Sequence, residues 1–192
     1  MPVTDRPRPG RPPRLSRAQI VAAAVEGGVQ TLTVRELAAR LGVTHSALYR
    51  WVRNLDELFD LIGEDIIDRV VPAAEPTPDT WRDWLAELAW GMHDEFLAIP
   101  GYAARIAGPH RHNPAAFAKL RDAVLAAFAV AGASPGMAEQ SWHIFAYDIV
   151  GWLGRRQEDH DYGGGAEPRF DIFLGALLRG LPAQEPGIAR PR

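Results

Sequence analysis

Helix start and stop signals recur along the chain, and no segment shows the alternation of apolar and polar residues that is typical of a strand. Residues 16–19 and 33–36 each have the form of a capping box, in which Ser or Thr is followed three positions later by Gln or Glu. Glycines and prolines end the apolar stretches that have helical spacing. The sequence therefore predicts an all-α fold of about nine helices, with no internal repeat.

Proline-rich segments predict how these helices divide into parts. Residues 1–14 are rich in Pro and Arg and are expected to form a disordered basic arm, and residues 183–192 a disordered tail. Three prolines between residues 72 and 78 form the clearest internal boundary. We therefore expect a small helical domain at residues 15–53, a connecting helix at 54–71, and a larger helical domain at 79–182.

Charge is distributed unevenly over the chain. Residues 1–53 hold nine arginines against three acidic side chains, whereas residues 54–192 hold twelve basic and twenty-one acidic side chains. A basic end on an acidic body favours one surface that meets a polyanion. An Arg-rich disordered arm alone would give the same balance, so charge does not decide between the two.

Composition excludes several classes of protein. The chain has no cysteine, which excludes disulfides, thiolate zinc sites and thiol nucleophiles. Its start lacks the apolar segment of a secretory signal, and its longest uncharged run, residues 123–138, is too short to span a bilayer. No spacing matches a nucleophile, metal or phosphate motif, so we do not expect an enzyme. We expect a soluble cytoplasmic protein without membrane contact or cofactor.

Residues 33–52 combine a short helix, a glycine turn and a second helix, which is expected to run from a cap at Thr44 to about residue 53. Ala38 suits the crossing of the two helices, Gly42 the tight turn and Leu48 the apolar contact beneath the second helix. Such a helix fits the major groove of DNA, about 12 Å wide, although helix-turn-helices also occur in other proteins. The residues expected to point outward can form hydrogen bonds and none is acidic: Thr44, His45, Ser46, Tyr49 and Arg50.

The stretch LTVRELAARLGVTHSALYRWVRNLDELFDLI, residues 32–62, resembles the DNA-binding domain of the TetR family of regulators. The elements that carry the resemblance are Thr33-x-Arg35-x-Leu37-Ala38, Leu41-Gly42-Val43, Ala47-Leu48-Tyr49 and Asp56-Glu57-Leu58. The resemblance implies a three-helix DNA-binding head at 15–53, a connecting fourth helix, and a divergent C-terminal domain that dimerises and binds an inducer. It also implies a homodimer that binds palindromic double-stranded operator DNA, commonly as a repressor.

Roles in DNA binding follow from the family pattern. His45 and Ser46 are the candidates for base contacts, and the Tyr49 hydroxyl for a phosphate contact. Ordinary surface roles remain possible: an ion pair with a nearby glutamate for Arg35, and packing for the aromatic residues. The family often has lysine at the start of the fourth helix, where this chain has Leu55, so that phosphate contact is in doubt. The full set of candidate DNA-binding residues is Thr33, Arg35, Thr44, His45, Ser46, Tyr49, Arg50 and Trp51.

The C-terminal part resembles, more weakly, the tetracycline-repressor branch of the family. The resemblance rests on a Trp-rich helix after residue 80, the Pro100-Gly101 break and the closing FDIFLGALLRGL, residues 170–181. The histidine that holds the metal in that branch aligns with Arg105, and the drug-contacting histidine with residue 70 or 71, both valine. Tetracycline is therefore not the expected ligand. His110 and His112 share a loop without a carboxylate partner, and we predict no metal site.

Aromatic residues concentrate after residue 80, where they suit either a core or an apolar ligand pocket. The resemblance favours a pocket for a small hydrophobic or aromatic inducer of unknown identity. The candidate ligand-binding residues are Trp84, Leu88, Met92, Arg105, Phe117, Trp142 and Phe145. Arg105 could pair with an anionic ligand or form a structural salt bridge. The alternative is a DNA-binding regulator that responds to no inducer.

Dimerisation is expected to use the helix that contains two glycines near residue 150 and the apolar last helix. Glycines allow two helices to approach closely, and an apolar terminal helix needs cover. In a monomer the same apolar residues would be core. The candidate dimerisation residues are Gly151, Gly154, Phe170, Phe173, Leu174 and Leu177.

Overall fold

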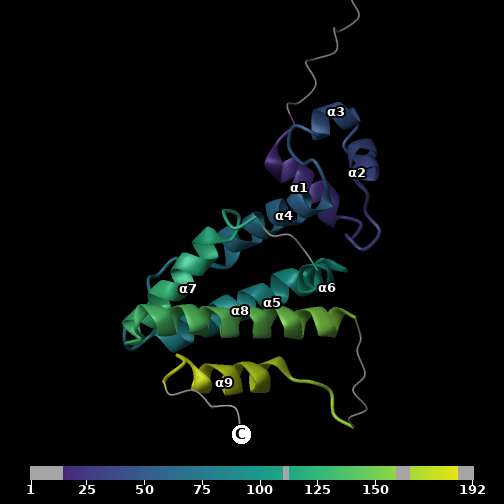
Figure 1. Cartoon of the computed structure of the whole chain (residues 1–192). Coiled ribbons are helices and arrows are strands. Elements are labelled where there is room, and N and C mark those ends of the chain that lie inside the picture. Colours follow the sequence, from purple (N-terminus) through teal and green to yellow (C-terminus); the bar gives the residue numbers. More distant parts are fainter. Residues whose placement is uncertain (1–14, 110–112, 159–164, 186–192) are drawn as a thin grey trace, which may run out of the picture.

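The computed structural model describes residues 15–109, 113–158 and 165–185, and within these ranges it contains nine α-helices and no strand, which confirms the predicted all-α fold (Figure 1). The arm at residues 1–14, His110, His112 and residues 186–192 of the predicted tail lie outside these ranges. No helix in the described ranges is long and apolar enough to cross a membrane. The helices are α1 (Arg17–Val25), α2 (Val34–Arg40), α3 (His45–Leu48), α4 (Leu55–Val70), α5 (Trp81–Ala98), α6 (Tyr102–Ala107), α7 (Ala118–Val130), α8 (Pro135–Gln157) and α9 (Phe170–Gly180).

The first three helices form a small head, and their ends are set by local side-chain caps. Both predicted capping boxes form, at Ser16 and at Thr33. Thr44 accepts a hydrogen bond from the backbone of Ala47, and Asn54 caps α4 in the same way. Each cap satisfies backbone N–H groups that the first turn of a helix leaves unpaired. The sequence therefore determines the helix starts of the head locally.

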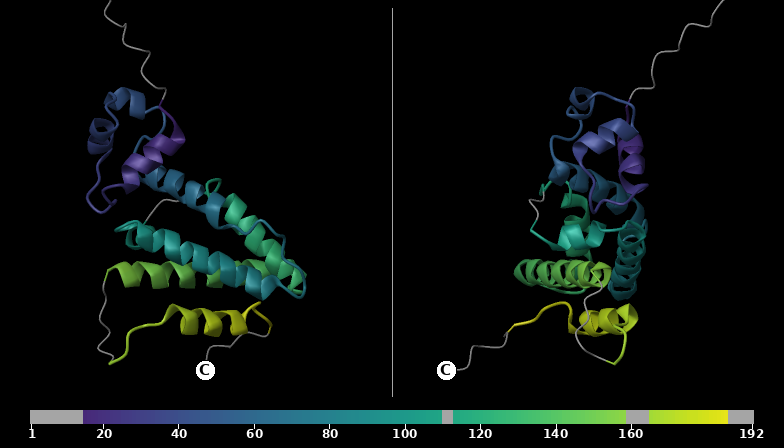
Figure 2. Two further views of the ribbon diagram at one scale, coloured as in Figure 1. Left: turned by 180° about the vertical axis from the view of Figure 1, so that it is seen from behind. Right: turned by 90° about the vertical axis from the view of Figure 1, so that its right-hand side faces the viewer.

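The connecting helix α4 leads from the head into the body (Figure 1). Its inner side is apolar and buried, including Leu58, Phe59, Ile62 and Ile66. In the body α5 and α8 pack together, α7 packs against both, and α9 lies against α5 on the side away from the head (Figure 2). The core is therefore one continuous apolar interior that extends from the head through α4 into the body.

The turn between α5 and α6 joins the body directly to the head. The backbone N–H of Val29 donates to the carbonyl of Pro100 at 3.0 Å. Gly101 follows with φ of 83°, and a Cβ there would overlap Gln30. Only glycine adopts this backbone at so close an approach without strain. The α1–α2 loop and the α5–α6 turn are thus held in contact.

Tyr102, the first residue of α6, is fully buried and donates its hydroxyl to the carbonyl of Phe59 in α4 at 3.4 Å. Burial, with a contribution from the Asp60 carboxylate, raises the pKa of Tyr102. The hydroxyl therefore stays protonated and remains a donor. On the α8 side, Gln157 donates to the carbonyls of Phe96 and Ile99 at 3.0 and 2.8 Å and accepts from the backbone N–H of Ala104 in α6 at 3.2 Å. Helix α6 is consequently held between α4 and α8.

Candidate DNA-binding surface and interior cavity

The helix-turn-helix is built as the sequence predicts, with a shorter second helix. Gly42 has φ of 63°, in the left-handed region, and the backbone N–H of Val43 returns to the carbonyl of Ala38 at 3.1 Å. Helix α3 ends at Leu48 rather than near residue 53, and the N–H of Trp51 returns to the Leu48 carbonyl three residues back, as in a turn. Leu48 is fully buried and holds α3 on the head.

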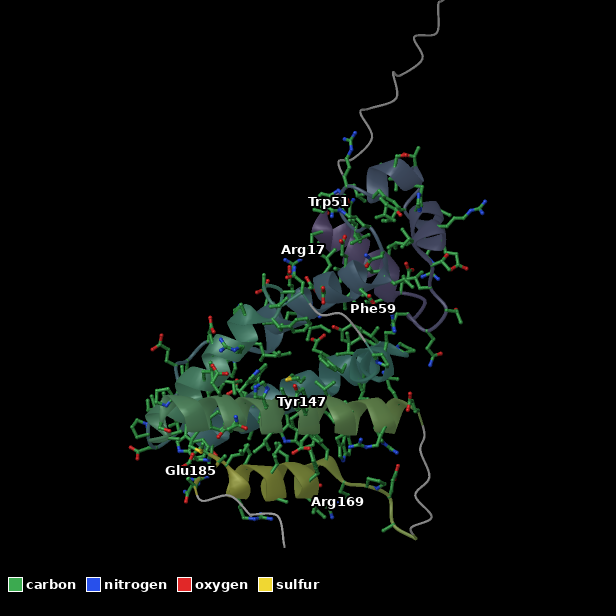
Figure 3. All side chains as sticks on the ribbon, viewed as in Figure 1. Arg17, Trp51, Phe59, Tyr147, Arg169 and Glu185 are labelled. Atoms are coloured by element: carbon green, nitrogen blue, oxygen red, sulfur yellow. The ribbon has the colours of Figure 1, made fainter. Side chains whose placement is uncertain are left out.

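All eight predicted DNA-binding residues are exposed on the head, on α2, α3 and the turns beside them. His45 and Tyr49 pack together with ring centroids 4.7 Å apart. Tyr49 and Trp51 remain 47% and 45% exposed, which is unusual for large aromatic side chains in a folded head (Figure 3). The structure thus leaves all eight residues exposed on the head, and their contacts with DNA stay predictions.

The acidic residue nearest this surface is already engaged. Glu36 accepts hydrogen bonds from the backbone and hydroxyl of Thr33 at 2.8 and 2.9 Å, and these bonds lower the pKa of Glu36. Its carboxylate therefore serves the cap of α2 rather than an ion pair with Arg35. Leu55, in the place where the family often has lysine, is half-buried and packs against the core. The departure at this position is explained by packing.

The body contains a partly open cavity of about 650 Å³ among α4, α5, α6, α7 and α8. This volume lies within the usual range for small-molecule sites. Four predicted ligand-binding residues, Met92, Phe117, Trp142 and Phe145, lie on its wall. The remaining lining residues are Gly63, Ile66, Ile67, Val70, Phe96, Ile106, Ala107, Gly108, Pro109, Pro114, Leu120, Arg121, Ala146, Tyr147, Val150 and Gly151.

Three predicted ligand-binding residues lie elsewhere. Leu88 is fully buried in the core, and the Trp84 indole N–H donates to the carbonyl of Ala74 at 2.7 Å. Arg105 forms an ion pair with Asp56 of α4 at 3.0 Å. Its guanidinium also lies 5.2 Å from the centre of the Phe59 ring, within the range of a cation–π contact. Arg105 therefore joins α6 to α4 instead of lining the cavity.

The α4 part of the cavity wall was missed by sequence reasoning. Ile66, Ile67 and Val70 line the cavity from the helix that also supports the head. Their apolar spacing on α4 was visible in the sequence, but spacing alone does not separate core from cavity wall. The far end of α6, residues 106–107, lines the cavity as well. Helices α4 and α6 therefore both line the cavity, while α4 also supports the head and the turn before α6 contacts it.

Three of the predicted dimerisation residues are buried within the chain, and the other three are half-buried. Gly154 faces α6, since a Cβ there would overlap the Ala107 side chain, so its close helix approach lies within the chain. Phe170 is buried among Trp90, His93 and Trp152, with ring centroids 4.6 to 4.9 Å away. Leu174 is also buried, whereas Gly151, Phe173 and Leu177 are half-buried.

Exposed apolar side chains on α8 and α9 were not predicted. Ile144, Tyr147 and Ile172 are 40%, 72% and 59% exposed. Figure 3 shows Tyr147 on α8 in the body. On α8 Ile144 and Tyr147 are about one helical turn apart, and Tyr147 also lies at the edge of the cavity that Phe145 lines. The spacing of Ile144 and Tyr147 on α8 was the sequence signal that could have indicated this apolar surface.

The described residues contain no group of three His, Cys, Asp or Glu side chains that could hold a metal ion. His110 and His112 lie outside these residues, so the prediction of no metal site stays a prediction for that loop.

A three-helix head in which a tight glycine turn joins α2 to an exposed α3 defines a helix-turn-helix protein. The family model described as "Transposase" matches residues 10–71, which is the head and α4, and covers less than half of the chain. The tetracycline repressor protein class A from transposon 1721 of Escherichia coli is 34% identical over 159 residues, or 80% of this chain and 71% of the relative. The chain belongs to the TetR family of transcriptional regulators.

Solved structures support the same assignment over nearly the whole chain. A TetR variant from Acinetobacter baumannii AYE in complex with minocycline is similar with a TM-score of 0.68 and 27% identity, covering 86% of this chain and 96% of that one. BioQ with its natural double-stranded DNA operator has a TM-score of 0.65 and 25% identity, covering 88% of this chain and 99% of that one.

Proposed function

We propose that the protein is a homodimeric transcriptional repressor that binds a palindromic operator through α3 and is released by a small hydrophobic or aromatic ligand. The observation that carries this proposal is that α4 supports the DNA-binding head at one end and lines the cavity with Ile66, Ile67 and Val70 at the other. The structures of BioQ with an operator and of TetR with minocycline are consistent with DNA and a small molecule as the two partners.

DNA would be bound by inserting α3 into the major groove. The exposed residues of α3 and the following turn, His45, Ser46, Tyr49 and Arg50, would face base edges and phosphates. Thr33 and Arg35 at the start of α2, together with Thr44 and Trp51, would contact the backbone beside the groove. In a two-fold dimer the two helices would read half-sites about 34–36 Å apart, or a multiple of this distance.

Release by ligand would pass through α6 and α4. The far end of α6 lines the cavity, while Tyr102 and Arg105 of the same helix bind Phe59 and Asp56 of α4. The turn before α6 also contacts the head at Val29. A ligand that favours another position of α6 would therefore favour another position of the heads, and the spacing of the two recognition helices would no longer match the operator.

The dimer would form through the exposed apolar residues of α8 and α9. Two copies joined by this face would cover Ile144, Tyr147 and Ile172. The half-buried residues Phe173 and Leu177 would extend the same face.

Ile144→Lys is expected to weaken the dimer at least tenfold, because it places a charge in the centre of an apolar contact. Sedimentation at a series of protein concentrations measures the dissociation constant. Ala126→Lys on the exposed side of α7 adds the same charge away from this face and should leave the constant unchanged. Equal dissociation constants for the two variants would show that the dimer uses another surface.

The experiment that tests the proposed function is a gel shift with the DNA upstream of the protein's own gene, with and without a panel of aromatic compounds. We expect a single retarded complex of one dimer, and its loss on addition of a compound that binds the cavity. If compounds bind while operator affinity stays unchanged, the protein is a regulator without an inducer.

A further inference from the structure

The cavity wall is almost without charge. Among the lining residues that the structure describes, Arg121 of α7 is the one charged side chain. The other polar side-chain groups are the indole N–H of Trp142 and the hydroxyl of Tyr147. Five aromatic rings lie on the wall: Phe96, Phe117, Trp142, Phe145 and Tyr147. Such a wall suits a ligand with aromatic rings and few polar atoms.

The charge of Arg121 is already balanced by two carboxylates. One terminal nitrogen, Nη2, donates to Oε1 of Glu139 on α8 in a short ion pair, and the other, Nη1, lies 3.3 Å from Oδ1 of Asp122. Each terminal nitrogen of the guanidinium thus already donates to a carboxylate, and the Arg121 and Glu139 side chains are 43% and 40% exposed. An anionic group of a ligand would have to share Arg121 with the carboxylates of Glu139 and Asp122, which repel it.

We propose that the cavity binds an uncharged aromatic compound without a metal ion, and that Glu139 determines this preference by holding and neutralising Arg121. The proposal rests on the function proposed above, and it defines the chemical class of the inducer. A charged ligand would lose its hydration in the cavity without gaining a free counter-charge, and burial of an unpaired charge is unfavourable. Glu139 is in this sense a specificity-determining residue that acts through Arg121.

The positions aligned with the two histidines of the tetracycline-repressor branch fit a ligand without metal. Arg105, at the position of the metal-binding histidine, is cationic and is engaged by Asp56. Val70 supplies only an apolar side chain to the wall, and residue 71 is valine as well. The described part of the wall thus offers neither of the imidazoles aligned with a metal–drug complex.

Two fluorescent probes that differ by one charge test the proposal. N-phenyl-1-naphthylamine is uncharged, and 1-anilinonaphthalene-8-sulfonate has the same rings with an added sulfonate. We expect the uncharged probe to bind the full-length protein about tenfold more tightly than the sulfonate, equally in EDTA and in Mg²⁺. Tighter binding of the sulfonate, or a requirement for Mg²⁺, would overturn the proposal.

Glu139→Gln tests the assigned role of this residue. It removes the negative charge that balances Arg121, so the affinity for the sulfonate should rise by about fivefold or more while that for the uncharged probe stays the same. Asp122→Asn is the matched control, because Asp122 is the more exposed of the two partners and its contact with Arg121 is longer. An equal rise in both variants, or no rise in either, would contradict the role of Glu139.

Ala146→Phe tests where the probe binds. Ala146 lies on the cavity wall, and a phenyl group there would occupy part of the cavity volume. We expect it to lower the affinity for the uncharged probe about tenfold. Ala126→Phe, on the exposed side of α7, should have no effect. Unchanged binding to the Ala146 variant would place the probe outside the cavity and overturn the proposal.

These measurements contain no DNA, so they separate the two proposals. If the uncharged probe is preferred and yet no cavity ligand releases the operator, the ligand class stands and the inducer role is wrong. If ligands release the operator and yet the sulfonate is preferred, the regulator stands and the ligand class is wrong.

Discussion

Ser46→Glu is expected to lower operator affinity by about a hundredfold or more. Ser46 is exposed in the middle of α3, and the new carboxylate would face the phosphates and base acceptors of the major groove. Like charges brought together at an interface cost several kcal/mol, which corresponds to this loss. Fluorescence anisotropy with labelled operator at constant salt concentration measures the change.

The head itself should stay folded in this variant. Ser46 lies in the first turn of α3, where an acidic side chain is favoured by the positive end of the helix. Its melting temperature should therefore match that of the unmodified protein. Ala126→Glu, which adds the same charge on α7, should change operator affinity by less than about twofold. Similar losses in both variants would mean that net charge, rather than α3, governs binding.

Gly154→Ala is expected to lower the free energy of unfolding by about 1–3 kcal/mol. The added methyl would overlap the Ala107 side chain and lie 3.2 Å from the carbonyl oxygen of Ala103. Both are short groups of α6 that have no rotamer to move away, so α6 and α8 must separate. Urea unfolding at one fixed protein concentration measures the loss, since dimerisation contributes to the apparent stability.

The same substitution in the same helix provides the control. Gly136 lies in the first turn of α8, and a Cβ there would meet no atom within 4 Å. Gly136→Ala should therefore leave the stability unchanged or raise it by up to about 1 kcal/mol, because Ala is the better helix former. Equal effects at the two positions would contradict the close approach of α6 to α8.

The shared contacts of α6 explain why its displacement should matter beyond stability. Its first residue, Tyr102, donates to α4, and its last, Ala107, lies both on the cavity wall and against Gly154. A helix of six residues cannot move at one end without the other. The Gly154→Ala variant thus also offers a way to displace α6 without ligand.

Local signals predicted the head almost completely. The two capping boxes, the turn at Gly42 and the buried Leu48 depend on residues within a few positions of each other, so the sequence expresses them directly. The end of α3 was placed about five residues too late, because a turn closed by the Trp51 N–H and the Leu48 carbonyl follows the helix there.

The cavity was predicted only in part, because helical spacing shows which side of a helix is buried but not which helix lies opposite. Met92, Phe117, Trp142 and Phe145 were identified, whereas the wall contributed by α4 was not. Arg105 was a candidate either for an anionic ligand or for a structural salt bridge, and the structure has the salt bridge, with a residue forty-nine positions away.

Helix start and stop signals were sufficient to determine the all-α fold and the helix-turn-helix, since caps and turns form between near neighbours. The family pattern added the full set of candidate DNA-binding residues from Thr33 to Trp51. Only the tertiary structure decided that Arg105 binds Asp56, that Glu139 pairs with Arg121, and that α6 packs closely against Gly154. Each of these contacts joins two helices that are distant in sequence, and their relative positions follow from how the whole core packs.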